Sequence, residues 1–158
     1  MARVSFDFDT ATTPEQIREA MLDFSDRRPR LWKDLAPKYY EVYSVGHDTA
    51  DVKEGSGLPF NIWAREGYDW SQPNTITWTV QDSNFCRPGL GVSMTITPTD
   101  DGGSKVHVDW EREPTTLRGK ILLGMVARND GSMLKGFVRK GVDSLPETLA
   151  ANPRPSGG

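Results

Sequence analysis

The sequence predicts an α+β fold in which an antiparallel β-sheet of about seven strands is covered on one face by a long C-terminal helix. Short strand-like segments follow one another between turns from Tyr39 to Glu113, which is typical of an antiparallel meander. From Thr115 to Leu149 apolar residues recur instead at helical spacing. Because the apolar face of such a sheet must be covered, we expect this terminal helix to lie across it.

The first elements follow from residues 4–35. Residues 4–8 alternate apolar and polar side chains, which indicates a half-buried strand. Thr13 and Gln16 then form a capping-box pattern with a proline between them, so a helix is expected to begin there. A second short helix is expected over Leu31–Leu35, ending before Pro37. The predicted order is therefore one strand, two helices, six strands and a final helix.

Turn signals separate the six later strands. The strongest is Asp100–Gly103, two aspartates followed by two glycines between strand-like segments, which favours a hairpin. The six strands are expected at Tyr39–Val45, Thr49–Glu54, Asn61–Trp70, Thr75–Asp82, Val92–Thr97 and Lys105–Glu113.

The terminal helix carries an irregularity in its middle. The apolar stripes before Ala127 and after Ser132 point in different directions, and Asn129–Ser132 between them favours a kink or a break. Four further glycines weaken the helix, through close packing on the sheet or by making a thin, mobile wall. They are Gly119, Gly124, Gly136 and Gly141. The pattern leaves open whether the helix is continuous.

Size and composition predict one domain over residues 1–150 and a disordered tail over residues 151–158. The formal net charge of -3 argues against nucleic acid as a partner. One cysteine, Cys86, fits a reducing compartment, and we expect a cytoplasmic protein without a signal peptide. His47 and His107 lie apart and no metal-ligand spacing occurs, so neither a metal nor another cofactor is predicted.

The terminal helix is basic although the chain is acidic. Between Thr115 and Leu145 two acids, Asp130 and Asp143, accompany six basic residues. These are Arg118, Lys120, Arg128, Lys135, Arg139 and Lys140. A basic amphipathic helix can bind a partner or an anionic membrane surface, but the solvated face of a core helix has the same pattern. Peripheral membrane contact is the less favoured interpretation, and a monomer or homodimer is expected.

The element order and the segments Trp63–Trp70 and Thr75–Val80 resemble the START-like, helix-grip superfamily. The run Tyr68–Pro73 is similar to that of bacterial polyketide cyclase/dehydrase-type (SRPBCC) domains. The resemblance covers about residues 3–149 and implies a curved antiparallel sheet wrapped on the long last helix, with an apolar cavity between them. Members include lipid carriers, hormone receptors, plant allergen-type binders and aromatase/cyclases, without a shared catalytic motif, so the resemblance implies the fold more than the function.

Strand alternation places several large apolar side chains toward the expected cavity. A wall rich in tryptophan and methionine suits a flat or aliphatic ligand, although such stripes also fill cores. The predicted ligand-binding residues are Trp63, Tyr68, Trp78, Val80, Met94, Trp110, Met125, Met133 and Phe137.

Two charged residues share the inner face. Glu66 has the strand parity of Ala64 and Tyr68, and Arg112 continues the parity of Trp110. An inward charge is costly unless it is paired. A buried Glu66 could act as a general acid or base, and Arg112 could hold a ligand carboxylate or an oxyanion. The favoured alternative is a structural ion pair, or a bulge at Gly67 that turns Glu66 to solvent.

Three functions are compatible with these patterns. The first is the binding of a small hydrophobic ligand such as a lipid, a polyketide or another aromatic or aliphatic metabolite. The second is a polyketide cyclase or dehydratase in which Glu66 and Arg112 are the catalytic candidates. The third is a partner- or membrane-binding module that uses the basic terminal helix.

Overall fold

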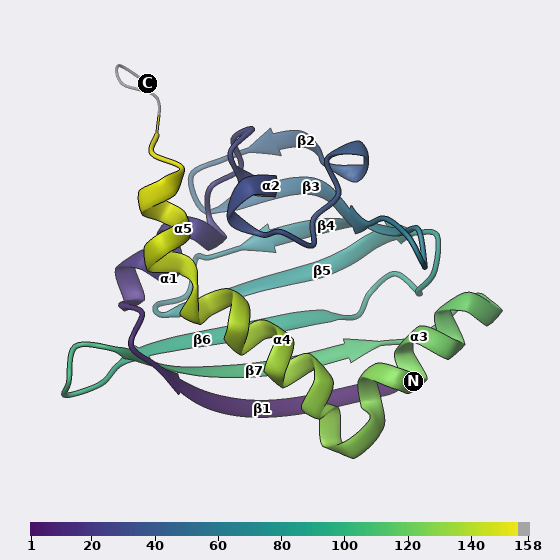
Figure 1. The fold of residues 1–158 in the computed structure, drawn as a ribbon. Helices are drawn as coiled ribbons and strands as arrows, with labels where there is room; N and C mark the ends of the chain where they lie inside the picture. Colours follow the sequence, from purple (N-terminus) through teal and green to yellow (C-terminus); the bar gives the residue numbers. More distant parts are fainter. Residues whose placement is uncertain (155–158) are drawn as a thin grey trace.

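A computed structural model describes residues 1–154. Seven strands form one antiparallel sheet in the order β1-β7-β6-β5-β4-β3-β2, and the long C-terminal helical segment runs across one of its faces (Figure 1). The predicted fold class and element order are therefore confirmed. The elements are β1 (Ala2–Thr10), α1 (Pro14–Met21), α2 (Arg28–Leu31), the 3-10 turn η1 (Pro37–Tyr39), β2 (Glu41–Val45), β3 (Thr49–Ser56), β4 (Ile62–Asp69), β5 (Thr75–Ser83), β6 (Gly91–Pro98), β7 (Ser104–Arg112), α3 (Leu117–Ala127), the 3-10 turn η2 (Arg128–Gly131), α4 (Ser132–Asp143) and α5 (Leu145–Ala151).

The sheet presents one apolar face to the helices. In β1 buried and exposed residues alternate along the whole strand, as the sequence pattern predicts. This strand pairs with β7, the last strand in the chain, with Phe6 opposite Val108. The two sheet edges are β1 and β2, so the first and second strands of the chain lie farthest apart.

The first helix begins as its sequence predicts. The side chain of Thr13 accepts a hydrogen bond from the Gln16 backbone, and the Gln16 side chain accepts one from the Thr13 backbone. The second helix differs from the expectation at Leu31–Leu35, because α2 begins at Arg28 and ends at Leu31. Proline is tolerated in a first helical turn, so Pro29 fits within the first turn of this helix.

The terminal helix breaks where the sequence favours a break. Asn129 and Asp130 adopt left-handed backbone angles, with φ of 53° and 56°, and Gly131 follows at φ 78°. Three successive left-handed residues cannot continue a right-handed helix. The chain therefore turns between α3 and α4, close to β1 (Figure 1).

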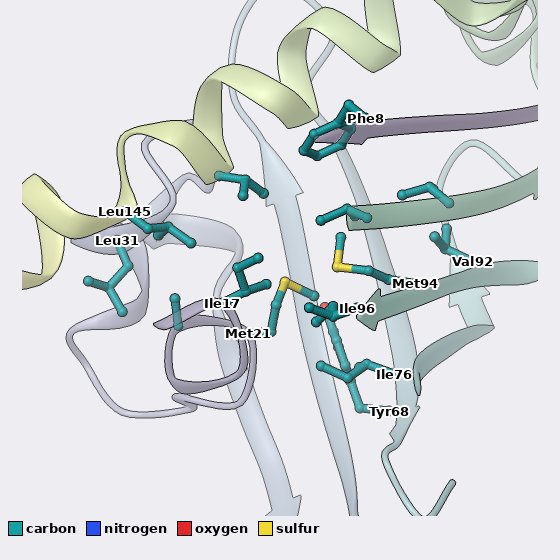
Figure 2. Close-up of a cluster of buried hydrophobic side chains, with 14 of the residues drawn as sticks. Phe8, Ile17, Met21, Leu31, Tyr68, Ile76, Val92, Met94, Ile96 and Leu145 are labelled. Atoms are coloured by element: carbon teal, nitrogen blue, oxygen red, sulfur yellow. The ribbon is translucent and has the colours of Figure 1, made fainter. Parts of the chain in front are cut away.

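The main core fills one part of the space between the sheet and the helices. Figure 2 shows Ile17 and Met21 of α1 pointing toward Met94 and Ile96 of β6, with Leu145 of α5 close by. All five side chains are buried. A smaller cluster forms where Leu123 of α3 packs with Val80, Phe85 and Cys86.

The sequence predicts a disordered tail that starts at residue 151, but ordered structure extends past this residue. Ala151 is the last residue of α5, and the Asn152 carbonyl accepts a hydrogen bond from Nη1 of the buried Arg27 at 2.7 Å. This contact to an interior arginine anchors the end of α5. The remainder of the predicted tail, residues 155–158, lies outside the described residues.

Replacing Gly131 by alanine should destabilise the fold. Its backbone is left-handed, and an added Cβ would collide with the Val4 side chain. The left-handed conformation alone costs a non-glycine residue about 1–2 kcal/mol, and the collision adds to this. Gly131→Ala should therefore lower the free energy of urea unfolding by more than about 1 kcal/mol.

The matched control is Gly124→Ala in α3, where an added Cβ meets nothing within 4 Å. This change should raise stability by up to about 1 kcal/mol, because alanine favours a helix over glycine. Equal effects of the two substitutions would contradict the role assigned to the turn.

Candidate functional site

A cavity with two adjoining compartments lies between the sheet and the helices α3 and α4. The helix-side compartment has a volume of about 440 Å³ and the strand-side compartment about 360 Å³. Both are bordered by Ile62, Phe85, Trp110, Arg112 and Phe137, so they adjoin. The helix-side compartment is completed by Phe60, Leu122, Leu123, Met125, Val126, Met133 and Leu134. The strand-side compartment is completed by Asp34, Leu35, Glu54, Gly55, Ser56, Trp63, Ala64, Glu66 and Trp78.

Six of the predicted ligand-binding residues border this cavity. Trp78 and Trp110 stand on the covered face of β5 and β7, and Trp63 comes from β4. The Trp63 ring makes a cation–π contact with Lys53, whose ammonium nitrogen lies 4.3 Å from the ring centre. Trp78 and Trp110 lie on one wall, as strand alternation predicts, whereas Trp63 has the opposite strand parity to the buried Ala64 and Glu66 and borders the cavity from the edge of β4.

The three predicted helix residues lie at the rim of the cavity. Met125, Met133 and Phe137 are 41%, 47% and 54% exposed. The deeper helix wall consists of Leu123 and Val126, which are buried. The three side chains expected at the inner wall therefore border the opening instead.

Three of the predicted ligand-binding residues are not among those that border the two compartments. Tyr68 and Met94 belong to the main core, and Val80 to the smaller cluster under α3. Tyr68 stacks on Trp78 with ring centres 5.5 Å apart. Alternation identifies the covered face correctly, but it does not say which part of that face is filled by neighbouring side chains.

The two catalytic candidates meet inside the cavity wall. Arg112 Nη2 donates to Glu66 Oε2 at 2.9 Å, and the two residues are only 5% and 7% exposed. The pairing of β4 with β5 shifts between Arg65 and Glu66, yet Glu66 stays buried, so the suggested turn to solvent at Gly67 does not occur. Burial disfavours the charged carboxylate and raises the pKa of Glu66 to about 7, although Arg112 acts in the opposite direction.

A second buried polar cluster lies beside this pair. Arg28 Nε donates to Glu54 at 2.8 Å, its Nη2 donates to the Tyr68 hydroxyl at 3.2 Å, and that hydroxyl donates to Glu54. Arg28 Nη1 also donates to the backbone carbonyls of Met21 and Asp23. These bonds connect α1 and α2 to β3 and β4. Burial and the neighbouring Glu54 hold the pKa of Tyr68 well above its usual value.

The sequence contains a signal for Glu54 in this cluster but none for Arg28. Glu54 has the same strand parity as Ala50 and Val52, which are buried, so its inward direction could have been predicted. Arg28 gave no comparable signal, because it lies in a four-residue helix without readable periodicity.

Two other reactive residues, Cys86 and His107, are not among those that border the two compartments. Cys86 is buried, and burial raises the pKa of its thiol, which disfavours the nucleophilic thiolate. His107 lies on the uncovered face of the sheet, where its ring nitrogens contact Asp7 at 2.8 Å and Asp109 at 3.0 Å. Within residues 1–154 no group of three histidine, cysteine or acidic residues is placed to hold a metal ion.

The basic residues of the terminal segment point largely to solvent. Arg118, Lys120, Arg128, Arg139 and Lys140 are exposed, and Lys135 is half-buried. Exposed apolar side chains stand among them. These are Leu117 and Ile121 together with the rim residues Met125, Met133 and Phe137. None of the described helices is long and apolar enough to cross a membrane.

Comparison with known proteins identifies the fold. No protein-family profile and no curated protein sequence matches this chain. Solved structures do. A protein of Thermus thermophilus superposes with a TM-score of 0.62 at 16% identity, covering 95% of both chains. A START superfamily protein of Mycobacterium smegmatis gives 0.59 at 14% identity over 96% of both chains. An aromatase/cyclase from a Streptomyces species gives 0.59 at 13% identity over 99% of this chain and 98% of its own.

These similarities confirm the START-like, helix-grip fold that the sequence resembles. At such low identity they establish the fold alone, and the residues of the cavity must be interpreted in their own right.

The raised pKa of Glu66 predicts a pH dependence of stability. The folded chain holds a proton on this carboxyl between about pH 4.5 and pH 7, whereas the unfolded chain does not. Stability should therefore fall as the pH rises through this window, by up to about 1.4 kcal/mol per pH unit for one proton. Urea unfolding between pH 4.5 and pH 8 measures this slope.

In Glu66→Gln the slope should be reduced by this one-proton contribution, whatever the absolute stability of the variant. The control is Glu147→Gln, at an exposed carboxylate of α5, which should keep the wild-type slope. If Glu66→Gln and the wild type show the same pH dependence, the carboxyl of Glu66 titrates normally.

Proposed function

We propose that this protein binds a small hydrophobic ligand, such as a lipid, a polyketide or another aromatic or aliphatic metabolite, between the sheet and the helices α3 and α4. The observation that carries the proposal is the helix-side compartment, because apolar side chains make up its lining apart from Arg112. Its volume of about 440 Å³ lies within the usual range of small-molecule sites. An apolar space of this size stabilises an apolar ligand by removing it from water.

The rim residues support entry of a ligand from outside. Met125, Met133 and Phe137 are large apolar side chains at least 41% exposed beside the compartment. Methionine side chains are flexible and adapt to ligands of different shape. The same fold in a START superfamily protein and in an aromatase/cyclase is consistent with the binding of a hydrophobic ligand. The expected cytoplasmic location remains a prediction.

Native mass spectrometry of the purified protein, followed by denaturing extraction, tests this proposal. A bound small molecule is expected in the wild type. Leu122→Trp should remove it, because Leu122 borders the helix-side compartment and the larger ring fills the space. The adjacent Ile121→Trp places the same ring at a position that is 54% exposed and outside the lining, and it should keep the molecule.

A protein that carries no molecule in any preparation, and that shows no thermal shift with a panel of apolar dyes and lipids, would refute ligand binding. Salt-sensitive binding to anionic vesicles would then favour the third function. In that case the exposed apolar and basic residues of α3 and α4 would contact the membrane surface.

A second candidate function, cyclisation or dehydration of a polyketide, is favoured by the Glu66–Arg112 pair. A carboxyl with a pKa of about 7 can both accept and donate a proton near neutral pH. It could remove a proton from a carbon between two carbonyl groups, while the guanidinium of Arg112 stabilises the resulting enolate oxygen. Both residues border the strand-side compartment, where such a substrate would contact Trp78 and Trp110.

If the protein is a cyclase, Glu66→Gln should lower the turnover of a poly-β-carbonyl substrate by about two to four orders of magnitude. Arg112→Met should also lower turnover, because it removes the stabilising cation. Substrate affinity, measured separately by fluorescence of the cavity tryptophans, should change far less in Glu66→Gln. Glu147→Gln serves as the control. Unchanged turnover in Glu66→Gln would eliminate Glu66 as the acid or base.

A further inference from the structure

We infer that the ligand is an amphiphilic acid, whose carboxylate or comparable anionic head is held by Arg112 while its apolar tail occupies the helix-side compartment. The inference rests on the proposed ligand binding and adds the chemical class of the ligand. It follows from the position of one charge in an otherwise apolar space.

Arg112 is the only charged residue among the described residues that border the helix-side compartment. It also borders the strand-side compartment, so Arg112 stands where the two compartments adjoin. The Cζ atom lies 5.8 Å from the centre of the Trp110 ring, which belongs to the same wall. A ligand that fills the helix-side compartment therefore has one charged neighbour, and that neighbour is a cation.

The guanidinium retains hydrogen-bonding capacity. Arg112 Nη2 donates to Glu66 and Nη1 donates to the Glu111 carbonyl, in bonds of 2.9 and 3.1 Å. An arginine side chain has five N–H donors in a planar fork, and these two bonds leave the others for an oxygen in the cavity. A carboxylate matches this fork and binds a guanidinium more strongly than a neutral oxygen does.

Glu66 affects how strongly Arg112 can bind an anionic head group. Its Oε2 already accepts a hydrogen bond from Arg112, so an incoming carboxylate shares the guanidinium with the carboxyl group of Glu66. Two carboxylates repel each other in a buried site, and a proton on one of them relieves the repulsion. Glu66 is suited to take this proton because burial already raises its pKa. Binding of the acid should therefore be accompanied by proton uptake at Glu66.

Other head groups fit the site less well. An alcohol offers Arg112 only a neutral acceptor, which forms a weaker bond. An amine would place a second cation beside Arg112 and would have to compete with it for Glu66. The cavity should therefore rank ligands with the same tail in the order acid, alcohol, amine.

Titration calorimetry with decanoic acid, decan-1-ol and decylamine tests this order. A charge-assisted bond is expected to give the acid about ten- to hundredfold higher affinity than the alcohol. In Arg112→Met this ratio should fall to near one. Glu66→Gln should increase the ratio, since Arg112 then lacks its competing carboxylate. Repeating the titration in buffers of different ionisation enthalpy should show proton uptake with the acid in the wild type and none in Glu66→Gln.

Arg118→Met is the matched control, because Arg118 is an exposed arginine on α3 outside the lining. It should keep the wild-type ratio. Should Arg112→Met fail to fold with Glu66 left unpaired, the double variant Glu66→Gln/Arg112→Met removes both charges and should also lose the preference. Equal binding of acid and alcohol by the wild type would overturn the inference and leave ligand binding intact. If none of the three probes binds, and extraction also finds no ligand, ligand binding itself fails.

Discussion

The apolar face of the seven-stranded sheet must be covered, and the helical segment that covers it cannot run straight. The rest of the structure depends on this constraint. Left-handed residues at Asn129, Asp130 and Gly131 divide this segment into α3 and α4. Over one part of the sheet, α1, α4 and α5 meet the strands in a filled core. Over the other part α3 leaves the cavity open beside the strands. A filled core and a ligand cavity are therefore not alternatives here, because each occupies its own part of the same face.

Two buried acid–arginine systems stand side by side on this face, and their surroundings give them different roles. Arg28 is enclosed by Glu54, Tyr68 and backbone carbonyls, so its donors are used within the protein. It fixes α1 and α2 to the sheet. Arg112 shares its terminal nitrogens between Glu66 and one carbonyl and faces open space. A buried charge that still faces a cavity is available to a ligand, whereas an enclosed one serves the fold.

The fold could be predicted from the sequence because its signals are local and repeated. Strand alternation, the Thr13–Gln16 cap and the glycine-containing turn at residues 129–132 each depend on a few neighbouring residues. The pairing of Glu66 with Arg112 could be anticipated for a similar reason, since both charges interrupt apolar strand faces and an inward charge needs a partner.

The remainder of the site depends on packing, which alternation does not encode. Tyr68, Val80 and Met94 face the covered side as expected, but other side chains surround them there. Leu122 and Leu123 border the cavity although they are ordinary leucines in a helical pattern. Whether an inward side chain meets a ligand or another side chain depends on which side chains from distant parts of the chain pack against it.

The pairing of β1 with β7 has a consequence for the order of folding. Strand β1 is an edge of the sheet and, among the described residues, its one strand partner is Ser104–Arg112, so it has no partner while the intervening hundred or so residues emerge from the ribosome. Thr12 likewise donates to the carbonyl of Val142, far along the chain. Closing such distant contacts is entropically costly and slow. During synthesis Val4, Phe6 and Phe8 therefore remain without their strand partners, which makes this first strand the segment for which a chaperone would have the longest time to act.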